Sequence, residues 1–187
     1  DEVVKQLMEM RDRAADYLQR NGRVAEDAFF YAEQNARLVR NAEQYYRSMF
    51  HGRDESWNLR DSHMAETLEE LVQHLKKRFR DVKVVVWAHN SHLGDARATE
   101  MGQRGELNIG QLVRQKHGSD SVLIGFTGYE GTVTAASNWD GGAERKRVRP
   151  GLSGSYEKLF HNVEQTDFML NLRDDREVAD ALRSRRL

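Results

Sequence analysis

The chain contains no cysteine and only one proline in 187 residues. Without cysteine it has no disulfide, no thiolate ligand for a metal and no cysteine nucleophile. A chain without cysteine also fits a reducing compartment, so we expect a cytoplasmic protein. Because proline interrupts helices, its scarcity favours long helical segments.

Long apolar runs and an excess of one charge are also lacking. No stretch reaches the ~18 apolar residues that a membrane span requires. The 29 basic and 30 acidic side chains leave a net charge of −1. Nucleic acids and anionic membranes usually attract a basic excess, so we expect neither as a partner.

The first part of the chain, residues 1–80, carries apolar residues at every third or fourth position, which predicts helices. The first stripe runs from Val3 to Tyr17 and is expected to stop at Asn21-Gly22. The second covers Val24 to Phe50. A third helix is expected to begin at Asp61 or Ser62, either of which suits an N-cap.

The second part, residues 81–187, changes character. Short apolar runs without helical period predict buried strands, and helical segments separate them. The predicted strands are residues 82–88, 121–126, 132–137 and 167–172, and the predicted helices are residues 108–116, 155–160 and 177–184. This alternation predicts an α/β fold with a mostly parallel sheet flanked by helices. We expect one domain over residues 1–187, with residues 138–154 as a loop.

One stretch concentrates polar chemistry, Val84–Arg97, which reads VVVWAHNSHLGDAR. An apolar run ends there in His89 and His92, with Asn90 between them. In parallel sheets, ligands bind at the carboxyl ends of the strands. We therefore expect both histidines to lie at such an end and to face one open cleft.

Three interpretations of this histidine pair remain open. In the first, the histidines cap a turn and bond only to the backbone. In the second, they bind a metal, although Asn90 stands where a His-Glu-x-x-His zinc helix has glutamate, and Asp95 is the only further ligand nearby. In the third, they carry out acid/base chemistry, moving a proton or polarising a carbonyl.

Other motifs are weaker. The stretch Gly151–Ser155 lacks the Gly-x-Ser-x-Gly spacing of a nucleophile elbow and is interpreted as a loop and helix cap. Arg145, Lys146, Arg147 and Arg149 form a basic run that is either solvated surface or an anion clamp. Arg60-Asp61 stands at the start of the helix that leads into the histidine stretch. These two residues either cap that helix or lie at its N-terminus near the cleft expected at the histidines.

Several motifs together resemble the erythromycin esterase-like family, part of which is labelled succinoglycan-biosynthesis-like. They are NLRDSHMAETLEEL, WAHNSHLGDARATEMGQRGELNIGQLVR, SVLIGFTGYEGTVTAAS and RVRPGLSGSYEKLFHN. The resemblance runs from about Arg60 to Leu172. It implies an α/β hydrolase unrelated to serine-elbow enzymes, which opens esters or lactones such as macrolides with histidine, carboxylate and water.

Carried over by position, the resemblance assigns catalysis to His89 and His92. Arg60, Asp61 and Asn90 are expected to contact a small-molecule ester or lactone. It implies no cofactor and no metal ligand. Two further hypotheses remain. The protein is an enzyme of the same fold that acts on another substrate, such as a polysaccharide ester, or it is a binding protein of the same fold without catalysis.

One departure from the family concerns a Gly-Glu-x-x-His-Gly motif in its first half, which supplies a water-activating glutamate and histidine. Neither His51-Gly52 nor His117-Gly118 has the required glutamate. We therefore expect residues 1–187 to be a fragment of the family domain, incomplete at both ends. The fragment alone is expected to be inactive, and its longer parent to be the esterase.

Overall fold

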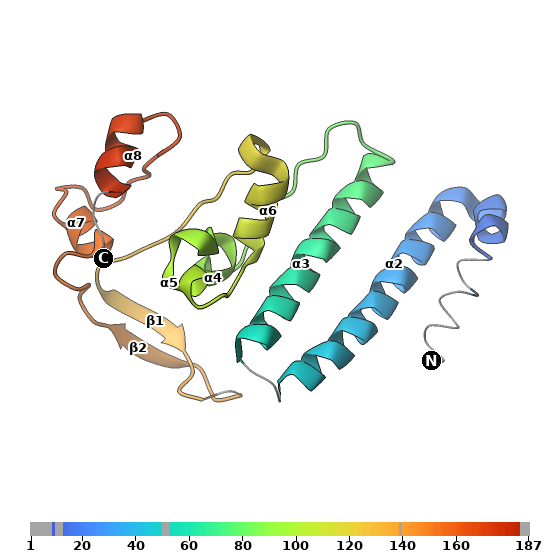
Figure 1. Ribbon diagram of the computed structural model, residues 1–187, viewed down its shortest axis with the longest axis horizontal. Helices are drawn as coiled ribbons and strands as arrows, with labels where there is room; N and C mark the ends of the chain where they lie inside the picture. Colours follow the sequence, from blue (N-terminus) through green and yellow to red (C-terminus); the bar gives the residue numbers. More distant parts are fainter. Residues whose placement is uncertain (1–8, 10–12, 50–52, 139, 184–187) are drawn as a thin grey trace. The chain divides into compact units, whose positions relative to one another are not determined.

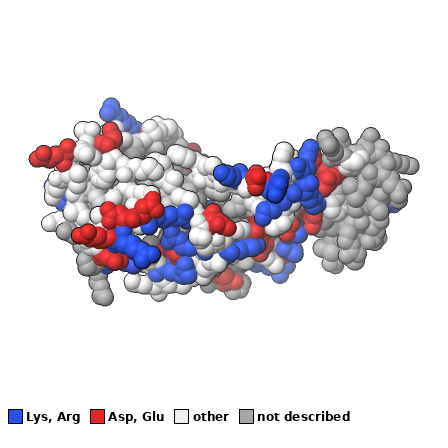
Figure 2. All heavy atoms as spheres, turned by 90° about the horizontal axis from the view of Figure 1, so that it is seen from above, with Lys and Arg blue, Asp and Glu red and all other residues white. Residues whose placement is uncertain are grey.

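A computed structural model of the chain describes residue 9 and residues 13–49, 53–138 and 140–183. The chain forms two compact units, Asp1–Gly125 and Phe126–Leu187. Within the described residues no helix is long and apolar enough to cross a membrane. Figure 2 shows acidic and basic side chains intermixed on the visible face, in keeping with the balanced composition.

The first unit is built on two long helices, α2 (Ala14–Ser48) and α3 (Arg53–Lys76), which lie side by side (Figure 1). Polar contacts join them along their length. Arg37 Nη1 donates to Glu70 Oε1 over 2.9 Å, and His74 Nε2 donates to Asp27 Oδ1 over 2.8 Å. The His74 ring also stacks on Phe30, with 4.2 Å between ring centroids.

Short helices complete this unit after a stretch, residues 77–89, that forms neither helix nor strand. They are α4 (Asn90–Leu93), the 3₁₀ turn η1 (Ala96–Ala98), α5 (Glu100–Gln103), α6 (Ile109–His117) and the 3₁₀ turn η2 (Gly118–Asp120). Of these, α6 packs against α3 and α4. The N-terminus of α6 is capped by Asn108, whose side-chain oxygen accepts from the Gln111 N–H over 2.9 Å.

The second unit holds an antiparallel hairpin and two short helices. Strand β1 (Gly131–Ala135) pairs with β2 (Glu144–Val148), and Val133 lies opposite Lys146. Helices α7 (Tyr156–His161) and α8 (Arg176–Arg183) follow. Ser155 caps α7 by accepting from the Lys158 N–H over 3.2 Å.

The predicted fold class is wrong. The chain is rich in helix, and the described residues form only a two-stranded antiparallel sheet, not a mostly parallel sheet flanked by helices. The runs 82–88, 121–126 and 167–172 form neither helix nor strand and belong to no ladder in the described part of the chain. A strand needs a neighbouring strand to bond its backbone, and these runs have none there.

The run 82–88 nevertheless keeps the alternation of a strand. Val84 and Val86 are 39% and 38% exposed, whereas Val85 and Trp87 are 91% and 83% exposed. The exposure of Val122, Ile124 and Phe126 in the next run ranges from 52% to 65%. The strands predicted at these runs are therefore wrong, although the alternating exposure of residues 84–87 is that of a strand with one open face.

Several predictions concern the positions of single helices and strands. Helices were correctly expected at α6, α7 and α8, as was a strand at β1. The helix stop at Asn21-Gly22 is wrong because α2 continues through it, and α3 begins at Arg53 rather than at Asp61. The loop expected over residues 138–154 contains β2. The start of the helix expected from Val3, and the last residue of the helix expected to reach Phe50, lie outside the described residues.

Buried positions in the described residues are mostly polar. Ala96 and Ile109 are the buried apolar residues. The buried polar residues are Ser48, Asp61, His74, Glu106, Asn108 and Ser121. Buried polar groups require hydrogen-bond partners. The hydrogen bonds of these buried residues are therefore expected to connect α3, α4 and α6.

Candidate active site

The candidate site is centred on the contact between His92 of α4 and Asp61 of α3. His92 Nδ1 lies 2.9 Å from Asp61 Oδ1 and 3.0 Å from Oδ2. The Ile109 N–H, at the start of α6, donates to Oδ2 over 3.1 Å. Both carboxylate oxygens therefore accept, which assigns the Nδ1 proton to His92 and leaves Nε2 as the acceptor of the neutral ring.

Asp61 is fully buried, with 0% exposure, whereas the side chain of His92 is 18% exposed. Burial raises the pKa of the Asp61 carboxyl above its usual value, because the charged form loses water. The hydrogen bonds from His92 and Ile109 act in the opposite direction but do not cancel this effect.

An aromatic residue that the sequence analysis missed fixes the ring of His92. Trp57 stacks on His92 with 4.7 Å between centroids and 7° between planes. The Trp57 Nε1–H donates to the Leu107 carbonyl over 2.7 Å. Trp57 stands four residues before Asp61, so this helical spacing could have placed both side chains on one face.

The segment before α6 is also tied to α3 and α4. Asn58 donates to the Gly105 carbonyl over 2.9 Å and accepts from the Leu107 N–H over 2.8 Å. Asn108, which is 1% exposed, donates to the Ser91 carbonyl over 2.8 Å. Asn58 thus holds the segment before α6 against α3, and Asn108 holds the turn that carries His92. Neither asparagine was among the predicted site residues.

His89 occupies a different environment. It is exposed and caps α4: its Nδ1 accepts from the Ser91 N–H over 3.2 Å and lies 2.9 Å from Ser91 Oγ. An Nδ1 that accepts carries no proton in the neutral ring, so His89 Nε2 is a donor. The two histidines therefore present opposite hydrogen-bonding character at Nε2.

The remaining predicted residues lie close by with less defined contacts. The Arg60 guanidinium lies 5.9 Å from the ring centroids of both Trp57 and Tyr45. Asn90 is the exposed first residue of α4, and its carbonyl accepts from the Gly94 N–H over 2.9 Å. The structure thus joins Asp61, His92 and Arg60 through Trp57, on α3 and α4 rather than at a strand end.

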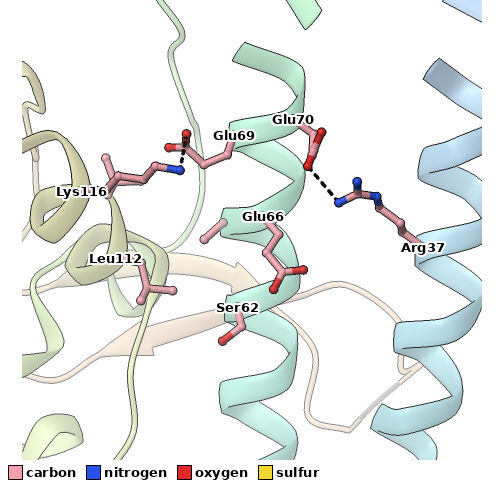
Figure 3. Close-up of a pocket in the computed structure, with 9 residues that line it drawn as sticks. Arg37, Ser62, Glu66, Glu69, Glu70, Leu112 and Lys116 are labelled. Atoms are coloured by element: carbon pink, nitrogen blue, oxygen red, sulfur yellow. Dashed lines mark hydrogen bonds and ion pairs between the residues drawn. The ribbon is translucent and has the colours of Figure 1, made fainter. Parts of the chain in front are cut away.

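A groove of about 390 Å³ lies along α3 between α2 and α6 (Figure 3). It is lined by Arg37, Ser62, Ala65, Glu66, Glu69, Glu70, Leu112, Val113 and Lys116. Its charges largely pair with each other: Lys116 Nζ lies 2.8 Å from Glu69 Oε2, and Arg37 Nη1 lies 2.9 Å from Glu70 Oε1. None of the predicted site residues lines this groove.

Metal ligands are scarce around the histidines. Among the described residues no group of three or more His, Asp or Glu side chains is arranged to hold a metal ion. With Asp61 occupied by His92 and Ile109, the pair His89 and His92 supplies few further ligands. The expectation that the site needs no metal stays a prediction.

A comparison with known protein families decides the affiliation of the chain. Residues 1–187 match the family Erythromycin esterase. The chain belongs to the erythromycin esterase family. Membership indicates a hydrolase-type function and a small-molecule substrate. No solved structure matches the chain.

Proposed function

We propose that the chain provides His92 as the acid/base group and His89 as the hydrogen-bond donor to the oxyanion of an ester or lactone hydrolase. The observation that carries the proposal is the difference between the partners of the two Nδ1 atoms, from which opposite polarity of the two rings is inferred. Nδ1 of His92 donates to buried Asp61, whereas Nδ1 of His89 accepts from Ser91. One ring is thereby prepared to take a proton and the other to give a hydrogen bond.

In the proposed reaction His92 Nε2 removes a proton from water as the water oxygen attacks the carbonyl carbon. The Asp61 carboxylate stabilises the imidazolium that forms, and Trp57 holds the ring plane. His89 Nε2–H donates to the developing oxyanion. Collapse of the tetrahedral intermediate breaks the bond to the alkoxide, which takes the proton from His92 and leaves as an alcohol.

Arg60 and Asn90 are proposed to contact the substrate. Arg60 stands one residue before Asp61 and lies near the Trp57 ring that stacks on His92. Asn90 lies between the histidines. A macrolide lactone or a polysaccharide ester would both supply the carbonyl that this mechanism requires.

The test compares hydrolysis of chromogenic esters and macrolides by residues 1–187 and by the longest natural polypeptide that contains them. His89→Ala and His92→Ala in the active form should each lower kcat by about 100- to 10,000-fold, the usual range for general acid/base help. The double variant should lose little more, because the two groups act as a unit. Single variants as fast as the wild type would refute the proposal.

A binding protein without catalysis is the second candidate. It is favoured by the lack of a Gly-Glu-x-x-His-Gly motif in the 187 residues. It predicts that no form turns over any ester of the panel, while a macrolide still binds in calorimetry. Turnover that disappears on mutation of His92 would exclude it.

A further inference from the structure

The two faces of the β1–β2 hairpin differ in charge. In the antiparallel register Thr132 lies opposite Arg147, and Thr134 lies opposite Arg145. Opposite residues point to the same side of a sheet, so these four side chains share one face, and all four are exposed. Lys146 and Glu144 belong to the other face, because side chains alternate along a strand.

The face that carries Lys146 is neutralised internally. Lys146 Nζ lies 2.8 Å from Glu144 Oε2 and also bonds Ser137, whose hydroxyl donates to Glu144 Oε1 over 2.9 Å. The Lys146 hydrogen bond holds the pKa of the Glu144 carboxyl below its usual value. Lys146 therefore has its counter-charge on the hairpin itself.

The arginine face has no such compensation. Arg145 Nε donates to Thr132 Oγ1 over 3.3 Å, a neutral partner. Within the described part of the chain no carboxylate lies at ion-pair distance from Arg145, Arg147 or Arg149. Arg149 follows β2 directly and is also exposed.

We propose that this arginine face is a docking surface for an extended acidic peptide segment. Arginines at every second position of a strand repeat at about 6.6–6.8 Å, and acidic side chains at every second position of an extended peptide repeat at the same distance. Each guanidinium can bind a carboxylate in a bidentate manner. Among the described residues β2 pairs only with β1, so its outer edge can also bond a peptide backbone.

Other polyanions fit the surface less well. Single-stranded nucleic acids usually stack bases on aromatic rings, and the described residues of this face are threonine and arginine. Binding sites for anionic lipids usually gather about four to eight cations, more than this face presents. An alternating peptide is the ligand that matches both the charge and its spacing.

The experiment measures fluorescence anisotropy of a labelled peptide that alternates glutamate and threonine, titrated with the chain of residues 1–187. A second peptide has the same composition with its glutamates in one block. We expect the alternating peptide to bind at least about 10-fold more tightly, a difference of about 1.4 kcal/mol. The affinity should fall as salt is raised from low to physiological concentration.

Variants locate the surface. Arg145→Gln combined with Arg147→Gln should weaken binding at least about 10-fold. The double lysine variant should have an affinity between those of the wild type and the double glutamine variant, because lysine keeps the charge but cannot bind a carboxylate in a bidentate manner. Lys146→Gln on the opposite face is the matched control and should leave the affinity unchanged. Circular dichroism of each variant monitors the fold.

Several outcomes would overturn the proposal. They are equal binding of the alternating and block peptides, and no binding of either. They also include unchanged affinity of the double glutamine variant, and an oligonucleotide, heparin or an anionic vesicle bound as tightly as the alternating peptide. The result does not depend on hydrolysis, so it can fail while the proposed function holds.

Discussion

At the scale of single residues, the buried carboxyl of Asp61 determines what His92 can do. It accepts from His92 and from the Ile109 backbone and has 0% exposure. Burial of a carboxylate costs free energy that its hydrogen bonds only partly recover, and this is why its pKa is raised. The shifted pKa of the buried Asp61 carboxyl makes the folding stability of the protein depend on pH.

Asp61→Asn is expected to remove this pH dependence. A raised folded-state pKa means that the folded chain binds more protons than the unfolded chain between the two pKa values, so the contribution of Asp61 to stability falls as pH rises through that window. The variant should lack this fall, and its stability relative to the wild type should increase as the pH rises above the usual pKa of an aspartate carboxyl. Urea unfolding of both proteins across this range measures the difference.

If instead the stability of the wild type increased relative to that of Asp61→Asn as the pH rises, the raised pKa of Asp61 would be contradicted. Hydrolysis provides an independent comparison. The asparagine side chain presents no negative charge to the imidazolium, so the variant should lose activity even at a pH where it is the more stable protein.

Trp57 is predicted to position His92 rather than to touch the substrate chemistry. Trp57→Leu removes the stacked ring and should lower kcat about 10-fold or more with little change in KM, because a displaced base loses its alignment. Trp57→Phe also lacks the bond to the Leu107 carbonyl but keeps a ring, and should retain more activity. The ring resonances of His92 in NMR spectra should shift in the leucine variant, because the stacked indole is lost, and the kcat loss without a matching change in KM separates positioning from substrate binding.

At the scale of elements, the close approach of α6 to the turn after α4 requires a glycine. A Cβ at Gly110 would lie 2.2 Å from the Gly94 carbonyl oxygen and 2.3 Å from that of Leu93. Both are backbone atoms, so neither can rotate away. The first turn of α6, which binds Asp61 through Ile109, is thus set against the turn that carries His92.

Gly110→Ala should therefore destabilise the first unit by about 1–3 kcal/mol, the usual cost of overpacking. Gly22→Ala is the matched control. Gly22 lies within α2, and among the described residues no atom outside the local helix backbone would come within 4 Å of an added Cβ. Alanine there should stabilise by about 0.5–1 kcal/mol. Denaturant midpoints of the two variants should shift in opposite directions; equal midpoints would show that α6 can move away.

At the scale of the whole molecule, the described chain exposes more apolar side chains than it buries. Val85, Trp87, Leu152 and Met169 are each at least 78% exposed, while Ala96 and Ile109 are the apolar residues that are buried. Contiguous apolar patches above a few hundred Å² are uncommon on soluble monomers. The run 82–88 is the clearest example, because its open face has neither a ladder partner nor a covering layer in the described residues.

The chain is therefore expected to bind the hydrophobic dye ANS. Val85→Thr combined with Trp87→Thr should lower the dye fluorescence clearly, since both side chains point to the open face of that run. Leu152→Thr, which changes one side chain that is 81% exposed in a separate loop, is the control and should have a small effect. Fluorescence at the level of a fully packed protein would contradict the exposure of these residues.

The sequence by itself determined the features that depend on neighbouring residues. Apolar spacing located α6, α7 and α8, and the cap of α7 followed from Ser155. The polar stretch after Val86 located the histidines, and its motifs indicated the family that the comparison confirmed. Local periodicity, capping and motif order are all written in adjacent residues.

Only the tertiary structure decided how distant residues meet. Short apolar runs predicted strands, but a ladder depends on a partner segment, which local sequence does not specify, and the parallel sheet was therefore wrong. The bond between Asp61 and His92 joins residues 31 positions apart, and the Trp57 stack on His92 depends on the same packing. Such contacts arise when α3, α4 and α6 are brought together, because side-chain direction and hydrogen-bond partners are then fixed by neighbours that lie far away in the chain.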